Sequence, residues 1–192
     1  MNVYDFDRTI CRFDSSTRFF RFCLRRMPCR VLRVLPGAFR AFLRYRRGGV
    51  SAKALKEKLF SFLRDEAETE ALVRDFWQRG GKGIQDWYLR QRRGDDLIVS
   101  ASPEFLLRPV AEKLGFRLIG TRMDAASGRI EGENCHDGQK VLRLRERFPN
   151  AAIEDFYSDS LSDAPLAALA GRAFLVSGSR LTRWPEDGKT TS

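Results

Sequence analysis

The stretch MNVYDFDRT, residues 1–9, decides the fold. Its apolar part, residues 1–6, predicts a short buried strand, and two carboxylates, Asp5 and Asp7, stand where that strand ends. In open α/β sheets the groups that bind ligands lie beyond the carboxyl ends of the strands. We therefore expect the functional site to begin at Asp5.

The rest of the chain contains four further apolar segments that are typical of strands, and helical patterns separate several of them. Alternating strands and helices predict a parallel sheet with covering helices. The expected fold class is therefore α/β with a Rossmann-like core, to which residues 123–134 add a small hairpin. The predicted strands are 97–100, 117–120, 153–157 and 173–176, and the predicted helices are 103–115, 138–148 and 161–171.

A long helical insertion follows the first strand. At 192 residues the chain has room for one core and one modest insertion. Residues 14–93 show helical periodicity without a convincing strand, too long a stretch for an ordinary connection. We predict a core of residues 1–13 and 94–192 and an all-helical cap of residues 14–93. Breaks are expected at Pro28, Pro36, Gly48-Gly49 and Gly80-Gly81, and the clearest cap helices are 51–63 and 67–79.

Asp5 and Asp7 suit phosphoryl transfer. One carboxylate attacks phosphorus and becomes an acyl phosphate, while its neighbour protonates the leaving alkoxide and later deprotonates water. Since two anions repel each other, this attack needs a hard cation such as Mg²⁺. The alternative is an acid pair in an ordinary turn, because Asp favours turns. The motif alone leaves both interpretations open.

Three later segments add groups to the same edge of the predicted sheet. Ser100 ends one strand, Lys140 opens a helix, and YSDSLSD, residues 157–163, supplies Asp159 and Asp163. They provide a hydroxyl, a cation for phosphate oxygens and a further carboxylate for a metal. Each has an ordinary alternative as a helix cap, a surface lysine or a turn residue. Their order and their places at strand ends favour the phosphoryl-transfer interpretation.

These residues resemble the four motifs of the haloacid dehalogenase superfamily over the whole chain, and the acid at Asp7 resembles the phosphatases of that superfamily. The resemblance implies a Mg²⁺-dependent phosphomonoester phosphatase that works through an aspartyl phosphate. It implies the following roles: Asp5 as nucleophile, Asp7 as acid/base, Ser100 and Lys140 as phosphate ligands, Asp5, Asp7 and Asp159 around the metal, and Thr9 and Asp163 in support.

The helical cap directly after the first motif is similar to subfamily IB, which contains phosphoserine phosphatases and phosphatidylglycerophosphatase C. Three positions differ from the typical motifs of this subfamily and bear on which ester is the substrate. Arg8 replaces a small residue, and Ala101-Ser102-Pro103 replaces the Gly-Gly of phosphoserine phosphatases. Asp14 stands where those enzymes have a glutamate that contacts substrate, but Asp14 is equally a helix N-cap in sequence. Phosphoserine itself is therefore the weaker candidate.

The whole net charge of +10 comes from one segment. Residues 15–50 hold ten arginines, no lysine and no acid, interleaved with large apolar residues. Such a segment can lie in an anionic membrane interface, and the resemblance to phosphatidylglycerophosphatase C implies a lipid phosphate reached from the cytoplasmic face. The alternative is a helical hairpin whose arginines point outward, acting on a soluble ester such as phosphoserine.

Nucleic-acid binding through the same arginines ranks lower, because a binding module would not need the catalytic set. The four cysteines form no CxxC pair and the one histidine, His136, cannot complete a zinc site, which favours a reducing cytoplasm. Charged residues interrupt the first apolar stretch, so neither a signal peptide nor a membrane span is expected. We expect a cytoplasmic protein that is peripheral on the membrane if the arginine segment binds lipid.

Overall fold

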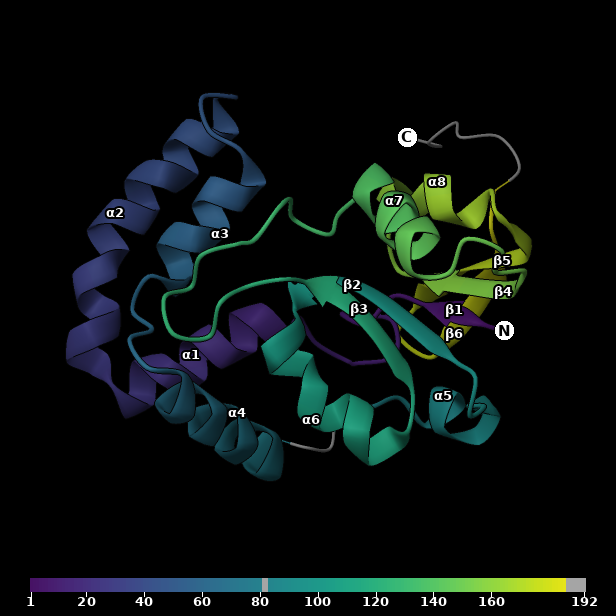
Figure 1. Ribbon diagram of the computed structural model, residues 1–192, viewed down its shortest axis with the longest axis horizontal. Helices are drawn as coiled ribbons and strands as arrows, with labels where there is room; N and C mark the ends of the chain where they lie inside the picture. Colours follow the sequence, from purple (N-terminus) through teal and green to yellow (C-terminus); the bar gives the residue numbers. More distant parts are fainter. Residues whose placement is uncertain (81–82, 186–192) are drawn as a thin grey trace.

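The computed structural model describes residues 1–80 and 83–185, which fold around one six-stranded sheet (Figure 1). The strand order is β3-β2-β1-β4-β5-β6, with β6 antiparallel to β5 and the other pairs parallel. This confirms the predicted α/β class with a Rossmann-like sheet. The strands are β1 Val3–Tyr4, β2 Leu97–Pro103, β3 Arg117–Thr121, β4 Ile153–Ser158, β5 Ala170–Ser177 and β6 Arg180–Arg183.

Strand β1 lies inside the sheet, between β2 and β4. Val3 pairs with Leu97 on one side and with Phe156 on the other, and Val3 is completely buried. Because successive side chains of a strand point to opposite faces, Val3 and Tyr4 belong to two different hydrophobic clusters. This burial on both faces explains why the strand is apolar up to Asp5.

Helices cover both faces of the sheet. Helix α6 (Glu104–Leu114) and helix α5 (Asp86–Gln91) share a hydrophobic cluster with Tyr4, whereas α7 (Gly138–Arg147) and the short α8 (Ala164–Ala167) share the cluster of Val3. Tyr88 of α5 packs edge-on against Tyr4, with 5.0 Å between ring centroids. The order of alternating strands and helices thus agrees with the sequence pattern.

Two details near the C-terminal end of the described chain differ from the prediction. The predicted helix 161–171 is only a 3₁₀ turn, Leu161–Asp163, followed by α8, because Ala170 already pairs with Ile153 in the sheet. Strand β6 was not predicted, because its side chains are exposed and its sequence lacks a buried apolar pattern.

Residues 14–93 fold into helices α1 (Ser15–Arg26), α2 (Pro28–Arg46), α3 (Ala52–Phe60) and α4 (Glu66–Gly80), followed by α5, which packs on the sheet. The predicted helices 51–63 and 67–79 are confirmed as α3 and α4. The break predicted at Pro36 is wrong, since α2 continues through it. Pro36 is on the exposed side of α2, where water can bind the carbonyl group that a proline leaves without its helical donor. The break predicted at Gly80-Gly81 falls partly outside the described residues.

Helices α2 and α3 form a pair at one side of the molecule, far from β5 and β6, while α1 and α4 lie between that pair and α6 (Figure 1). A loop of the core holds α3 in place. The predicted hairpin 123–134 has one bridge, Met123 to Ile130, and its turn at Gly128 (φ +71°) lies so close to Phe60 that a Cβ atom would clash with the backbone of that residue. Glu57 accepts a hydrogen bond of 2.9 Å from the Ile130 amide.

No helix in the described ranges is both long enough and apolar enough to cross a bilayer.

Candidate active site

The first motif leaves the sheet at Asp5. The Asp5 amide donates to the Tyr157 carbonyl at 2.8 Å, which continues the ladder of β1 by one residue. The chain then turns, with Arg8 in the left-handed region (φ 57°), and a Cys11 amide bond of 2.9 Å to the Phe6 carbonyl closes the turn. Asp5 is only 7% exposed. Its carboxylate is therefore held at the carboxyl end of the central strand in a largely dry site.

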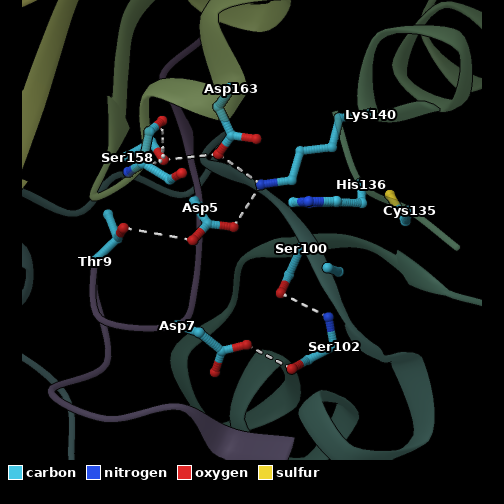
Figure 2. Close-up of polar contacts among 12 residues, drawn as sticks. Asp5, Asp7, Thr9, Ser100, Ser102, Cys135, His136, Lys140, Ser158 and Asp163 are labelled. Carbon is cyan, nitrogen blue, oxygen red and sulfur yellow. Dashed lines mark hydrogen bonds and ion pairs between the residues drawn. The ribbon is translucent and has the colours of Figure 1, made fainter. Parts of the chain in front are cut away.

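Lys140 joins two of the predicted site residues. Lys140 is in the first turn of α7. Its Nζ lies 2.7 Å from Asp5 Oδ1 and 2.7 Å from Asp163 Oδ2 (Figure 2). The Ser158 hydroxyl also donates to Asp163 Oδ2, at 2.7 Å. Although burial alone would lower the pKa of Lys140, Asp5 and Asp163 raise it. The lysine therefore remains a cation directly beside Asp5.

Thr9 links Asp5 to Asp159. Its Oγ1 lies 3.5 Å from one oxygen of each carboxylate and accepts a 2.9 Å hydrogen bond from the Asp159 amide. Burial raises the pKa of Asp159, and nearby Arg8 opposes that rise. Thr9 is fully buried. It fixes the distance between the first and last motifs.

The residues around Asp5 fit a hard cation. Two carboxylates, Asp5 and Asp163, pair with the Lys140 ammonium, a third, Asp159, is linked to Asp5 through Thr9, and Asp163 Oδ1 is buried without a hydrogen-bond partner in the described chain. Burial also raises the pKa of Asp5, against the effect of Lys140. No three acidic, histidine or cysteine side chains within residues 1–80 and 83–185 meet as a complete ligand set. Mg²⁺ suits this arrangement, because it uses one or two carboxylates and completes its shell with water and phosphate oxygens.

Asp7 has different surroundings from Asp5. One of its oxygens accepts a 2.6 Å hydrogen bond from the Ser15 amide at the start of α1, and the other accepts from the Ser102 hydroxyl. Figure 2 shows Asp7 and Ser102 together, apart from Asp5 and Lys140. Burial and then Asp14 raise the pKa of Asp7, whereas the bonds from Ser102 and Ser15 lower it. A carboxyl group with a raised pKa is suited to donate a proton.

Ser100 was predicted to end its strand, but β2 continues to Pro103 and Ser100 is the fourth of its seven residues, where it is completely buried. Its Oγ accepts a 3.1 Å hydrogen bond from the Ser102 amide. In the described residues no hydrogen bond joins Ser100 to Asp5 or Lys140. Its hydroxyl proton is therefore available to a ligand between the two acids.

Asp14 and Arg8, which the sequence offered as possible substrate contacts, lie at the edge of the site. Asp14 is the N-cap of α1 and accepts a 2.7 Å hydrogen bond from the Thr17 amide, and it also lines a pocket together with Asp7. Arg8 is exposed and contributes to a neighbouring arginine-lined hollow of about 690 Å³. Asp14 therefore combines the cap role with a position beside the site.

The pocket beside Asp7 has a volume of about 460 Å³ and lies between the core and helices α1, α2 and α3. Sequence reasoning missed several polar groups in and around it. Ser102 was noticed only as a departure from Gly-Gly, and Lys56 carried no signal beyond one more basic residue on a helix. The missed residues are Ser15, Ser16, Lys56, Ser102, Thr121 and Asn134.

Three comparisons place the chain among known proteins. It is 29% identical to protein CicA of Caulobacter vibrioides over 185 residues, which covers 88% of this chain and 82% of that one. A Mycobacterium tuberculosis protein named as a probable phosphatase is 34% identical over 97 residues, covering 45% of this chain and 33% of the relative. A Bordetella pertussis protein of unknown function has the same fold, with a TM-score of 0.75, 24% identity and coverage of 90% and 87%.

Residues 3–168 match the family model of the haloacid dehalogenase-like hydrolases. The matched range contains the whole cluster from Asp5 to Asp163 and both faces of the sheet up to α8. The chain therefore belongs to the haloacid dehalogenase-like hydrolase family.

Proposed function

We propose that this hydrolase is a Mg²⁺-dependent phosphomonoester phosphatase that forms an aspartyl phosphate on Asp5. The observation that carries the proposal is the buried chain Asp5–Lys140–Asp163, with Asp159 attached through Thr9. In this chain the Asp5 carboxylate lies beside the Lys140 cation at the end of the central strand, which supports the proposed role of Asp5 as nucleophile. The family and the relative named as a probable phosphatase support the same chemistry.

The two acids divide the reaction. An Asp5 oxygen attacks phosphorus, and the bond between phosphorus and the ester oxygen breaks as Asp7 protonates the leaving alkoxide. In the second step Asp7 removes a proton from water, water oxygen attacks phosphorus, and Asp5 is released as a carboxylate with inorganic phosphate as product. The raised pKa of Asp7 suits the first step, because more of the group carries the proton that the alkoxide needs.

The other residues hold the phosphoryl group. Lys140 and the Ser100 hydroxyl would donate to its equatorial oxygens, and Asp163 with Ser158 keeps the Lys140 ammonium in place. Asp5 and Asp159 would bind Mg²⁺, with Asp7 as the third group assigned to it. When bound, Mg²⁺ supplies positive charge that offsets the repulsion between Asp5 and the phosphate.

We further propose that residues 14–93 act as a helical cap, as in subfamily IB, and that the substrate is a lipid phosphate at the cytoplasmic face of a membrane, as the resemblance to phosphatidylglycerophosphatase C implies. Helix α2 supports the membrane proposal because it has a buried side, an exposed apolar side and a side rich in arginine. Val31 and Ala38 are buried, while Leu32, Phe39, Phe42 and Leu43 are 53%, 62%, 43% and 38% exposed along an adjacent stripe. A second stripe, spaced as one helix face, holds Arg33, Arg40, Arg44 and Arg47.

These arginines are free to meet phosphate groups. Arg26 and Arg30 form ion pairs with Asp75 and Glu68 of α4, but no ion pair involves Arg33, Arg40 or Arg44 within the described ranges. An exposed apolar stripe beside unpaired arginines is the pattern of an interfacial helix. A soluble ester remains the alternative substrate. RNA binding through the same arginines is the lower-ranked alternative, and a comparison of the protein's binding to anionic vesicles with its binding to RNA would distinguish the two.

The catalytic part of the proposal is tested with an aryl phosphate. Asp5→Asn should abolish Mg²⁺-dependent turnover, because an amide cannot form the acyl phosphate. Chelation of the wild-type enzyme should do the same, and added Mg²⁺ should restore activity. Asp86→Asn is the matched control, since Asp86 is exposed and, within residues 1–80 and 83–185, forms an ion pair with Arg12 outside the cluster around Asp5. Full activity of Asp5→Asn or of the chelated enzyme would overturn the mechanism.

A further inference from the structure

The pocket beside Asp7 has an apolar wall and one half-buried cation. Its apolar wall comes from the three cap helices, and its polar groups cluster where the cap meets the core. If Asp7 protonates the leaving oxygen, the rest of the leaving group must extend into this pocket, so the following inference rests on the proposed function. The apolar wall consists of Phe20, Tyr45, Ala52, Leu55, Leu59 and Phe60.

Lys56 of α3 is the cation of this pocket. Its Nζ donates to the Ala101 carbonyl and to Asn134 Oδ1, both at 2.7 Å, and both acceptors are neutral. No ion pair of Lys56 occurs within residues 1–80 and 83–185. Burial lowers its pKa to about 8, although Asp7, Asp14 and Cys135 act in the opposite direction. Partial burial of an ammonium without a carboxylate partner costs free energy, and an anionic ligand would relieve that cost.

Attachment of the cap does not explain Lys56. Glu57 and the tight contact at Gly128 already fix α3 to the core loop 123–134. Thr121 Oγ1 also lies 2.6 Å from the Ala101 carbonyl and 2.9 Å from Asn134 Oδ1, and its one hydroxyl proton can serve one of these acceptors at a time. An uncharged side chain of similar length in place of Lys56 would therefore leave one neutral acceptor without this donor, which does not require a positive charge.

We propose that Lys56 determines specificity by binding an anionic group of the leaving alcohol, so that the enzyme selects phosphomonoesters whose alcohol carries both a negative charge near the reacting oxygen and an apolar chain. The negative charge meets Lys56, and the chain lies along the wall of α1 and α3. Tyr45, which is 43% exposed, stands where this pocket opens to solvent and lies three residues from Phe42 of the exposed stripe. A long chain can therefore leave the pocket along α2.

Three matched soluble probes separate the two features of the alcohol. The first, 2-phosphooxyoctanoate, has a carboxylate and a chain; 2-octyl phosphate of similar chain length lacks the carboxylate; phospholactate has the carboxylate without the chain. We expect the wild-type enzyme to show its highest kcat/KM with 2-phosphooxyoctanoate. Lys56→Met should lower the preference for it over 2-octyl phosphate by about 10- to 100-fold, the range expected for one charged hydrogen bond.

The loss should occur mainly in KM, because the carboxylate does not change charge in the reaction and Lys56 would bind it equally in the ground and transition states. Lys56→Arg should keep part of the preference. Lys58→Met is the matched control, since Lys58 is exposed on the same helix, and it should leave the preference unchanged. Equal slowing of all three probes by Lys56→Met would overturn the proposal and assign Lys56 to the phosphoryl group or to the fold.

A binding measurement keeps the test independent of turnover. By calorimetry, 2-hydroxyoctanoate should bind wild type about 10- to 100-fold more tightly than Lys56→Met, and 2-octanol should bind both equally. If the wild-type enzyme does not hydrolyse an aryl phosphate, the proposed function is refuted. If 2-hydroxyoctanoate binds equally to the wild type and to Lys56→Met, the role of Lys56 is refuted. Circular dichroism of Lys56→Met and Lys56→Gln shows whether the variants are folded.

Discussion

Asp5 and Asp7 are two residues apart, yet they lie in two differently built halves of the site. Asp5 is surrounded by groups from the ends of neighbouring strands and the helix α7, with Lys140 at 2.7 Å. Asp7 is surrounded by hydroxyl and amide groups, from Ser102 and from Ser15 of the cap. In the mechanism we propose, the half around Asp5 reacts at phosphorus and the half around Asp7 faces the leaving group. In this proposal chemistry is thus assigned to the sheet edge, and selectivity to the junction with helices α1 to α3.

The largest expected difference between the two halves follows from removing the carboxyl group of Asp7. Asp7→Asn should slow turnover of an alkyl phosphate by roughly 10²- to 10⁴-fold, the range for a general acid or base. An aryl phosphate needs little protonation, so its phosphoenzyme should form with a smaller loss. Rapid-quench measurement of both esters checks this. Equal slowing of phosphoenzyme formation would remove Asp7 from the acid role.

The next largest effect is expected at the arginines of α2 and its C-terminal end, which we propose to bind an anionic membrane. Replacement of Arg33, Arg40, Arg44, Arg46 and Arg47 by Gln should weaken sedimentation with phosphatidylglycerol vesicles by at least about 100-fold, since each basic residue near an anionic surface contributes about 1 kcal/mol. Added salt should weaken binding of the wild type in the same direction.

A variant with the same net charge controls this measurement. Gln at five exposed arginines outside α2, namely Arg64, Arg90, Arg108, Arg180 and Arg183, should retain most of the vesicle binding. If both variants lose binding equally, the net charge rather than α2 attracts the protein. If the wild type ignores anionic vesicles at low salt, a soluble phosphate ester becomes the better substrate candidate.

The smallest expected effect concerns the hydrogen bond from Ser102 to Asp7 and its influence on the pKa of Asp7. The Ser102 hydroxyl lowers the pKa of Asp7 by donating to its ionised form, so Ser102→Ala should raise that pKa. Hydrolysis of the phosphoenzyme needs Asp7 as a carboxylate, and its rate falls as pH drops through the pKa. The acidic limb of the single-turnover pH profile should therefore move up by about one pH unit, as expected for loss of one hydrogen bond to a charge. A shift to lower pH would contradict the assignment.

Much of the half around Asp5 follows from the sequence, because parallel strands bring their carboxyl ends to one edge. That rule was enough to expect Asp5, Lys140, Asp159 and Asp163 together, and the hydrogen bonds of Lys140 and Thr9 show that they meet. Their chemical roles are proposals. The α/β class was predicted correctly from a different pattern, the alternation of strands and helices.

The half around Asp7 was not predictable, because its members depend on how the insertion folds back over the core. Lys56 and Asn134 are far apart in sequence, and only the docking of α3 on the loop 123–134 brings them together. Local patterns also failed at Pro36, where an exposed position tolerates proline within α2, and at β6, which pairs at the edge without a buried face.

The central claim, that Asp5 carries the phosphoryl group, is tested most directly by trapping it. Asp7→Asn enzyme incubated with Mg²⁺ and an aryl phosphate should accumulate the phosphoenzyme, because the amide cannot activate water. Borohydride reduction, proteolysis and mass spectrometry should then find homoserine at position 5, and the double variant with Asp5→Asn should show none. Turnover without a trapped acyl phosphate, or a phosphoryl group on another residue, would contradict the account.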